Sequence, residues 1–357
     1  MAITVVKTRY HMLRKPGVIL AFLLSALVAS PARGDTADDA IERGISYFKN
    51  KKYDQANEQY TLALRIDPKS AVAFFDRGLA FAQKGEFDKA VADYTDALRI
   101  NPKYSNAFVA RGHAFDHKGE FDKAIADFTK ALGINPKDSN AFDARGLAFG
   151  QKGEFDRAIA DYTEAIRLDA KSAVAFYNRG LTFGQKDEFD KAIADFTQAL
   201  GINPKDSNAF VARGLTFSHR AFSSSDRLRD FDNAIADFTE ALRINPNDAK
   251  TLGYRAVAFI LKNNRDKAIA DFTEVLRIDP KDARTYYCRG MAYYDKGEFD
   301  KAIADYSQAL RIDPKYVGVY HDRAITYDKL HDTARAEADR AKEKELKGAN
   351  KDVFNID

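Results

Sequence analysis

The 357-residue sequence predicts an all-α fold built from repeated two-helix units, and three observations lead to this prediction. Prolines recur at a step of 34 residues along most of the chain. Alanine, glycine and aromatic residues recur at fixed distances from these prolines, and the apolar positions between them have helical spacing. The prolines of the series are Pro68, Pro102, Pro136, Pro204, Pro246, Pro280 and Pro314.

The repeat is clearest when this proline is numbered position 32 of each unit. Ala170 stands where one proline is missing, and the step from Pro204 to Pro246 contains an eight-residue insertion within 218–230. Position 20 is alanine in all nine units, position 8 is glycine in seven, and position 11 is always aromatic. The units begin at Ala37, Ala71, Ser105, Ser139, Ala173, Ser207, Ala249, Ala283 and Val317.

Each unit is predicted to contain two helices. Positions 4, 8 and 11 form an apolar stripe on the first helix, and positions 20, 24 and 27 form one on the second. Asn-Pro or Asp-Pro at positions 31–32 ends the second helix, because the residue before proline disfavours the α conformation. Glycine at position 15, as in Gly119, marks the turn between the helices. We expect serines near the unit boundaries, such as Ser70 and Ser139, to cap the first helices.

These positions resemble the tetratricopeptide repeat (TPR) family over roughly residues 37–330, although Phe or Tyr replaces the family's Trp at position 4. The resemblance implies a TPR α-solenoid, a right-handed superhelix of antiparallel helix pairs with about nine repeats including a C-terminal cap. It also implies a concave groove that binds peptides or protein segments, and a non-enzymatic role as an adaptor or scaffold.

The chain divides into four expected parts. Residues 1–34 form a leader, and residues 35–316 form eight TPR units, including the insertion within 218–230. Residues 317–347 form a divergent ninth unit whose polar second helix suits the end of a solenoid. Residues 348–357 are expected to be a flexible tail. The insertion is either a tolerated surface loop or a secondary contact for an acidic partner.

The leader has the pattern of a secretory signal peptide of a bacterial protein. A basic start without acidic residues precedes the 12-residue apolar run Val18–Ala29, and small residues follow, so cleavage after Ala32 or Gly34 is expected. Removal takes away five basic residues, so the formal net charge falls from +3 to −2, which gives no bulk electrostatic case for binding nucleic acid. We therefore expect export, most simply to the periplasm; secretion, or anchoring by an uncleaved leader, is the alternative.

A repeated pair of opposite charges falls on the two apolar stripes. Position 7 is arginine in all nine units, and position 23 is aspartate in eight, with Gln59 in the first unit. Because a lone buried charge is costly, we expect each arginine to pair with an aspartate, within one unit or between neighbours. Recurrence in every unit favours a structural role over a catalytic one. This arginine–aspartate ladder comprises Arg77, Asp93, Arg111, Asp127, Arg145, Asp161, Arg179, Asp195, Arg213, Asp237, Arg255, Asp271, Arg289 and Asp305.

In the family, positions 2, 5, 6, 9, 12 and 13 of the first helix face the groove. Here they carry many apolar and aromatic residues, with asparagines suited to peptide amides. Individual members could instead pack against the neighbouring repeat. The residues predicted to line the groove, called the groove set, are Phe75, Leu79, Asn106, Val109, His113, Asn140, Asp143, Leu147, Tyr177, Asn178, Leu181, Asn208, Val211, Leu215, Tyr254, Tyr287 and Met291, with Cys288 beside them.

Two alternative functions stay open. An enzyme subunit or metal-binding protein could use His113 and His117, which are four residues apart with Asp116 beside them, but zinc needs three or four ligands and no third is obvious. The second alternative function is a self-assembling scaffold of the cell envelope. Cys288 is expected to be a packing residue rather than a nucleophile. We expect a protein or peptide partner, no nucleic acid, no cofactor, no metal and no enzymatic activity, with membrane contact only through an uncleaved leader.

Overall fold

The computed structural model describes residues 36–352, with side chains as far as residue 348, so the predicted signal peptide lies outside the described residues. The described residues form α-helices and no strands, which confirms the all-α prediction. The helices are α1 (Ala37–Lys49), α2 (Tyr53–Ile66), α3 (Ala71–Gln83), α4 (Phe87–Ile100), α5 (Ser105–His117), α6 (Phe121–Ile134), α7 (Ser139–Gln151), α8 (Phe155–Leu168), α9 (Ala173–Gln185), α10 (Phe189–Ile202), α11 (Ser207–Arg220), α12 (Arg227–Ile244), α13 (Ala249–Leu261), α14 (Arg265–Ile278), α15 (Ala283–Asp295), α16 (Phe299–Ile312), α17 (Val317–Lys329) and α18 (Thr333–Asp352).

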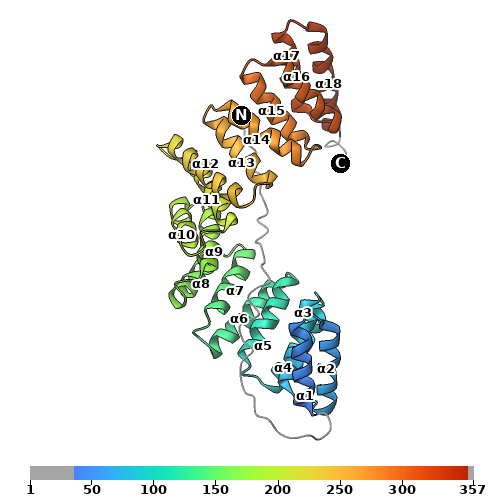
Figure 1. The fold of residues 1–357 in the computed structure, drawn as a ribbon, viewed down its shortest axis with the longest axis vertical. Helices are drawn as coiled ribbons and strands as arrows, with labels where there is room; N and C mark the ends of the chain where they lie inside the picture. Colours follow the sequence, from blue (N-terminus) through green and yellow to red (C-terminus); the bar gives the residue numbers. More distant parts are fainter. Residues whose placement is uncertain (1–35, 353–357) are drawn as a thin grey trace.

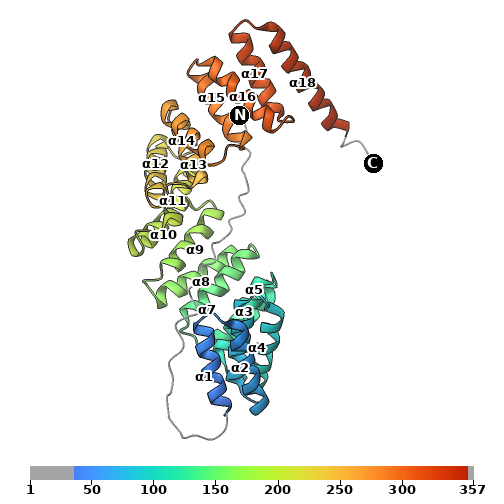
Figure 2. The same cartoon turned by 45° about the vertical axis from the view of Figure 1, so that its right-hand side comes forward.

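The helices stack in pairs into a curved solenoid (Figures 1 and 2). Odd-numbered helices are the first helices of the units, and even-numbered helices are the second. The first helices of neighbouring units contact one another from α1 to α13, and again between α15 and α17. Among the described residues, the second helices make no contact of comparable extent with each other. The first helices are therefore packed more tightly along the chain and line the inner side of the curve.

The helix ends follow the local sequence, with one correction. Ser70 caps α3, because its hydroxyl accepts a hydrogen bond from the backbone N–H of Ala73 at 3.2 Å. Ser139 does not cap α7, although we expected it to. It is the first residue of that helix, and Asp138 takes the capping position instead. At the turn within a unit, Gly119 has a φ of 75°, a left-handed conformation that glycine adopts without strain.

Small residues bring the two helices of a unit close together. Ala124 of α6 is fully buried against α5. A Cβ atom added to Gly112 of α5 would lie 2.7 Å from Cε1 of Phe128 on α6. The aromatic ring at position 24 thus fills the space left by the glycine at position 8, which explains why the two residue types recur together.

The insertion lengthens the second helix of the sixth unit, so that α12 has 18 residues where the second helices of the other units before the ninth have 14. Arg220 at the end of α11 donates to both carboxylate oxygens of Asp230, at 3.1 and 2.6 Å, and also pairs with Asp190. Asp230 is only 2% exposed. Arg220 is therefore occupied by these carboxylates, so any positive charge that the segment 218–230 offers to a partner comes from Arg227 and Arg229, which are exposed.

The chain ends in a longer helix than expected. Helix α18 reaches Asp352, so the segment 348–357 is helical over its first residues and is not a tail from residue 348 onward. Within α18, Glu343 is buried and contacts His321 of α17 at 3.2 Å. No helix in the described part of the chain is both long enough and apolar enough to span a membrane.

Candidate functional site

The groove set lies along the first helices, on the inner side of the curve, but its members differ in exposure. Asn106 and Asn140 are exposed, and most of the others are partly buried. Asn178 and Leu181 are buried, with exposed fractions of 8% and 7%. These two side chains are packed and offer almost no surface, which corrects their assignment to the groove lining.

The aromatic members of the groove set pack on aromatic residues of the second helices and, for Phe75, also on Tyr104 at the start of α5. The ring of Phe75 lies 5.9 Å from that of Tyr94 and 4.9 Å from that of Tyr104. Tyr177 lies 5.7 Å from Phe196 in the same way. These rings pack on the core while remaining partly exposed, so the structure shows the packing contacts, and groove lining stays a prediction.

Two hydrogen bonds join the first helices of successive units. Asn178 donates to the carboxylate of Asp143 at 3.2 Å, and the hydroxyl of Tyr287 donates to Asp322 at 2.6 Å. Both bonds link position 5 of one unit to position 6 of the next. Burial raises the pKa of Asp143 to about 6, although the bond from Asn178 acts in the opposite direction. A partly buried carboxylate therefore lies on this side of the first helices, in contact with the next unit.

The two histidines of the metal hypothesis pack against aromatic rings. His117 stacks on Phe87 at 4.6 Å, and His113 lies edge-on to Phe128 at 5.2 Å. Nowhere in the described residues do three or more His, Cys, Asp or Glu side chains gather in a way that could hold a metal ion. The described residues therefore bring no third ligand of the kind that a zinc site needs to His113 and His117.

Cys288 packs against the neighbouring unit. It is partly buried and contacts the cluster formed by Ala256, Ala268 and Phe272. Burial raises the pKa of the Cys288 thiol, which disfavours the reactive thiolate. These contacts fit a packing residue.

The arginine–aspartate ladder forms within single units. Each arginine donates from Nε and Nη2 to the two carboxylate oxygens of the aspartate on the second helix, at 2.7 to 2.9 Å. The ninth unit has the same pair, Arg323 with Asp339. In the first unit, Arg43 donates to Gln59 at 2.8 Å. Burial raises the pKa of Asp93 even though Arg77 acts in the opposite direction, so desolvation outweighs the pair's attraction there.

A hydroxyl at position 25 extends each ladder pair to the preceding unit, and the sequence interpretation missed it. Nη1 of Arg179 donates to Oγ1 of Thr163 at 2.9 Å, and that hydroxyl donates to the carbonyl of Ile159 at 2.7 Å. The same bond recurs along the chain, so each arginine joins two units. The sequence contains a signal for this contact, because position 25 is Thr or Ser in each of the first eight units. The acceptors are Thr61, Thr95, Thr129, Thr163, Thr197, Thr239, Thr273 and Ser307.

Asp76 also belongs to a groove-facing position but was not included in the groove set. It occupies position 6 of the second unit and is 6% exposed. Burial raises the pKa of its carboxyl to about 7. Only its position on a groove-facing site of the first helix could have drawn attention to it, because position 6 carries different residues in different units.

The family assignment is shown by sequence matches over most of the chain. Residues 41–105, 75–139, 173–206, 223–248 and 283–316 match the tetratricopeptide repeat, and residues 146–187 and 256–297 match the TPR repeat. The chain belongs to the tetratricopeptide repeat family, whose members are in general protein–protein interaction proteins that bind peptides or proteins. No curated protein matches the chain.

Solved structures share this fold. The C-terminal part of a TPR repeat-containing protein from Cytophaga hutchinsonii aligns with a TM-score of 0.57 and 19% identity, covering 69% of this chain and 97% of that one. A tetratricopeptide repeat protein from Parabacteroides merdae aligns with a TM-score of 0.52 and 18% identity, covering 72% and 98%. PilF of Pseudomonas aeruginosa aligns with a TM-score of 0.50 and 19% identity, covering 59% and 92%. At these identities the likeness supports the fold alone.

Proposed function

We propose that this protein is a non-enzymatic adaptor that holds an extended peptide or protein segment along the inner side of its solenoid. The observation that carries the proposal is the continuous row of partly exposed apolar side chains on successive first helices. Leu79, Val109, Leu147, Tyr177 and Val211 belong to this row, one on each of α3, α5, α7, α9 and α11, and each is partly buried. Among the described residues, no further helix covers them.

The polar members of the row suit a peptide ligand. Asn106 and Asn140 are exposed and one repeat apart, so their amides can donate to and accept from the backbone of an extended chain. The apolar side chains between them provide contact area. Peptide binding in this mode combines backbone hydrogen bonds with side-chain pockets.

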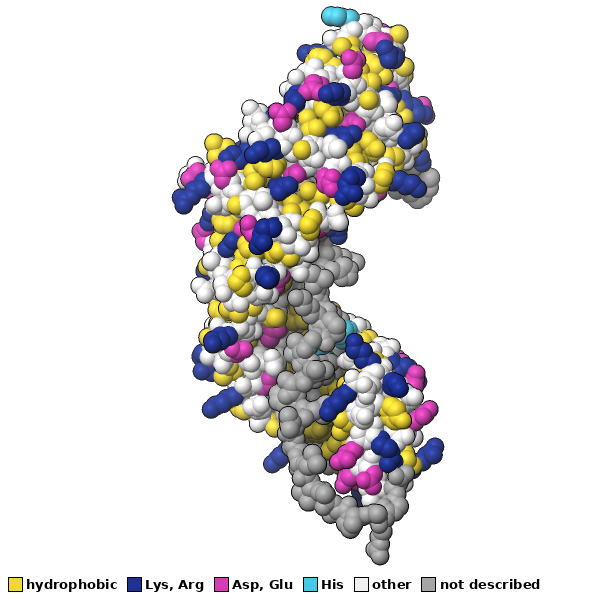
Figure 3. All heavy atoms as spheres, viewed as in Figure 1, with side chains coloured by type: hydrophobic (Ala, Val, Ile, Leu, Met, Phe, Trp, Pro, Cys, Tyr) yellow, Lys and Arg dark blue, Asp and Glu magenta, His cyan; other side chains and the backbone are white. Residues whose placement is uncertain are grey.

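The surface charge supports a protein partner rather than a nucleic acid. On the face shown in Figure 3, basic and acidic side chains are interspersed with apolar ones, with no broad basic area among the coloured residues. A nucleic-acid site depends on clustered Lys and Arg.

We further propose that the protein acts outside the cytoplasm. The support is the leader sequence alone, with its basic start and the apolar run Val18–Ala29. Mass spectrometry of the chain recovered from the periplasm of an expressing bacterium tests this. A chain beginning at Arg33 or Asp35 is expected, and an uncleaved chain found only in the cytoplasm would contradict export.

Selection from a displayed library of random peptides tests the adaptor function. Peptides that bind the full chain are expected to slow hydrogen exchange in α5, α7 and α9, because these first helices carry the row of apolar side chains. Protection confined to the second helices would place the site elsewhere and contradict the proposal.

A further inference from the structure

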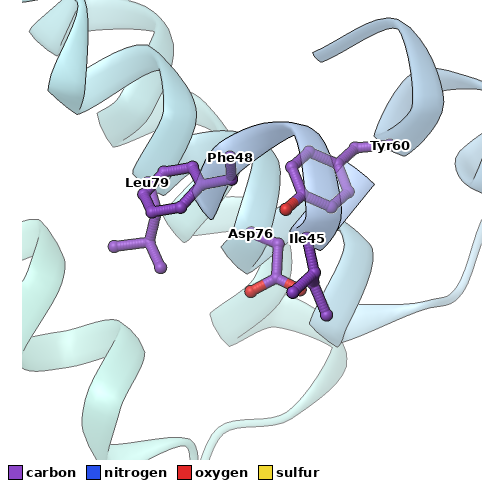
Figure 4. Close-up of a pocket in the computed structure, with 5 residues that line it drawn as sticks. All are labelled: Ile45, Phe48, Tyr60, Asp76 and Leu79. Carbon is purple, nitrogen blue, oxygen red and sulfur yellow. The ribbon is translucent and has the colours of Figure 1, made fainter. Parts of the chain in front are cut away.

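A small cavity lies between the first and second units, on the inner side of the solenoid. Its volume is about 20 Å³, and its wall consists of Ile45, Phe48, Tyr60, Asp76 and Leu79. Figure 4 shows the hydroxyl of Tyr60 directed toward Asp76, with Ile45 beside the carboxylate and Phe48 and Leu79 completing the wall. A cavity of this size holds about one water-sized group.

Asp76 is buried without a partner in the described part of the chain. Its exposed fraction is 6% and that of Tyr60 is 1%, and no described residue donates a hydrogen bond to the carboxylate. Burial of an ionised carboxylate without a hydrogen bond or a counter-ion is costly. This cost is the cause of the raised pKa of Asp76.

Other buried or partly buried aspartates show what a satisfied carboxylate looks like in this fold. The ladder aspartates accept two hydrogen bonds each from arginine, and Asp230 accepts two from Arg220. Asp322 occupies position 6 of the ninth unit, as Asp76 does in the second, and accepts a hydrogen bond from Tyr287 at 2.6 Å. Asp76 differs from these in having no hydrogen-bond donor among the described residues.

The surrounding charge favours a cation. In α3, α5, α7 and α9 the only arginines are those of the ladder, and each is paired with an aspartate of a second helix; these four helices contain no lysine. The same helices carry Asp76, Asp116 and Asp143. Apart from the ladder pairs, these four helices therefore carry three carboxylates and no lysine or arginine. Helix α1, which forms the other wall of the cavity, adds Asp38, Asp39 and Glu42 against Arg43 and Lys49. A ligand with positive charge is electrostatically complementary to this balance.

We propose that this cavity binds the ammonium group of a lysine side chain carried by the peptide segment, with Asp76 as its counter-ion. The proposal rests on the adaptor function and names the chemistry of the partner. An ammonium is close to a water molecule in size and therefore matches the cavity, whereas the planar guanidinium of arginine is larger. The phenol oxygen of Tyr60 can accept one of the three N–H bonds. The aliphatic stem of the lysine lies against Phe48 and Leu79.

The experiment selects displayed random peptides on the full chain, on Asp76→Asn and on Asp322→Asn. Asparagine keeps the shape of the side chain and removes the charge. Asp322→Asn is the matched control, because it changes the same repeat position where the carboxylate already has a donor. Circular dichroism and melting curves establish that both variants are folded.

We expect peptides selected on the unmodified chain and on Asp322→Asn to share a lysine at one position, and peptides selected on Asp76→Asn to lack it. Replacing that lysine by norleucine in a synthetic peptide should weaken binding to the unmodified chain at least about tenfold, and Asp76→Asn should weaken binding of the lysine peptide equally. The two changes together should cost no more than either alone, because they remove one interaction.

Two results would overturn the proposal, and they are distinguishable. Peptides that bind tightly but show no lysine preference, and bind Asp76→Asn equally well, would refute the lysine pocket and leave the adaptor function standing. Failure to recover any peptide on the unmodified chain would count against both the lysine pocket and the adaptor function. The norleucine peptide keeps the test valid even if Asp76→Asn folds poorly, because it leaves the protein unchanged.

Discussion

Arg111 of α5 donates two hydrogen bonds to Asp127 of α6, from Nε to Oδ2 at 2.7 Å and from Nη2 to Oδ1 at 2.9 Å. Its Nη1 donates to Thr95 of the preceding unit at 2.9 Å. The aromatic rings of Phe108 and Phe115 lie 5.8 and 5.9 Å from the guanidinium carbon. One arginine thus joins the two helices of its own unit and the unit before it.

Removal of the ladder carboxylate should destabilise the fold strongly. Asp127→Ala leaves the partly buried guanidinium of Arg111 without its counter-ion, so we expect a loss of about 3–5 kcal/mol in the free energy of unfolding. Urea unfolding followed by circular dichroism measures it. Asp127→Gln is the control, since Gln59 holds this position in the first unit and accepts from Arg43, and it should cost less. An Asp127→Ala chain as stable as the unmodified one would show that the pair has no structural role.

The bond between units should contribute less. Thr163→Val removes the hydroxyl that accepts from Arg179 and should cost about 1 kcal/mol, because one hydrogen bond is lost while the shape is kept. Thr163→Ser keeps the hydroxyl, as Ser307 does naturally at this position, and should cost less than half of that. Hydrogen exchange in α8 and α9 reports the local change. Equal exchange in the Val and Ser variants would contradict a role for the hydroxyl.

Glycine at position 8 should be intolerant of a side chain. In Gly112→Ala the new Cβ would lie 2.7 Å from the ring of Phe128, so the helices must separate or the ring must move, at a cost of about 1–3 kcal/mol. Gly133→Ala in α6 meets nothing within 4 Å and should stabilise the chain by about 0.5–1 kcal/mol. Melting temperatures compare the two. A Gly112→Ala chain that melts as high as Gly133→Ala would show that the close approach is not required.

Asp76 should make the stability of the fold depend on pH. Its pKa is about 7 in the folded chain and near its ordinary value of 3.8 in the unfolded chain. The folded state therefore binds the extra proton between these values, and stability falls as the pH rises through this window. The full effect above pH 7 is on the order of 4 kcal/mol. The titratable groups beside Asp76 are the phenols of Tyr60, Tyr94 and Tyr104, whose pKa values are all raised, so they stay neutral in this range.

The comparison with Asp76→Asn isolates this effect. The variant should be more stable than the unmodified chain at pH 8 and close to it at pH 4, because asparagine carries no charge to bury at either pH. Urea unfolding at the two pH values measures the difference. A stability difference that is the same at both would show that Asp76 titrates normally.

The regular features of this fold could be predicted because they recur. The spacing of Pro102 and Pro136 sets the length of a unit, and Gly112 with Phe128 defines how its helices meet. Arg111 and Asp127 fall on facing stripes, so their contact follows from helical periodicity. Periodicity does not determine whether an arginine pairs with the aspartate of its own unit or of a neighbouring unit. The structure was needed to show that the pairs form within units.

The non-repeated features were harder to predict. Leu181 and Asn178 occupy groove positions by register but are buried, because exposure depends on the size of the neighbouring side chains. Position 6 is aspartate in only two units, and within the described residues Asp322 has a hydrogen-bond donor and Asp76 has none, so no repeated pattern marked Asp76. Helix α18 extends to Asp352, beyond the end expected from the repeat length. Function resides in such differences between units, and a repeat pattern does not contain them.

Peptide binding along the inner side of the solenoid should depend on the exposed asparagine side chains there. Asn106 and Asn140 can be replaced without opening a cavity, because both side chains are exposed. Gln198 is an exposed amide on the second helix α10, so Gln198→Ala is the matched control. All three chains should have the same melting temperature.

The measurement is the dissociation constant of a library-selected peptide, determined by calorimetry for the unmodified chain, the Asn106→Ala/Asn140→Ala chain and the Gln198→Ala chain. Loss of two hydrogen bonds of about 1 kcal/mol each predicts binding at least tenfold weaker in the double variant and unchanged in the control. Equal dissociation constants for all three chains would contradict peptide binding along the inner side.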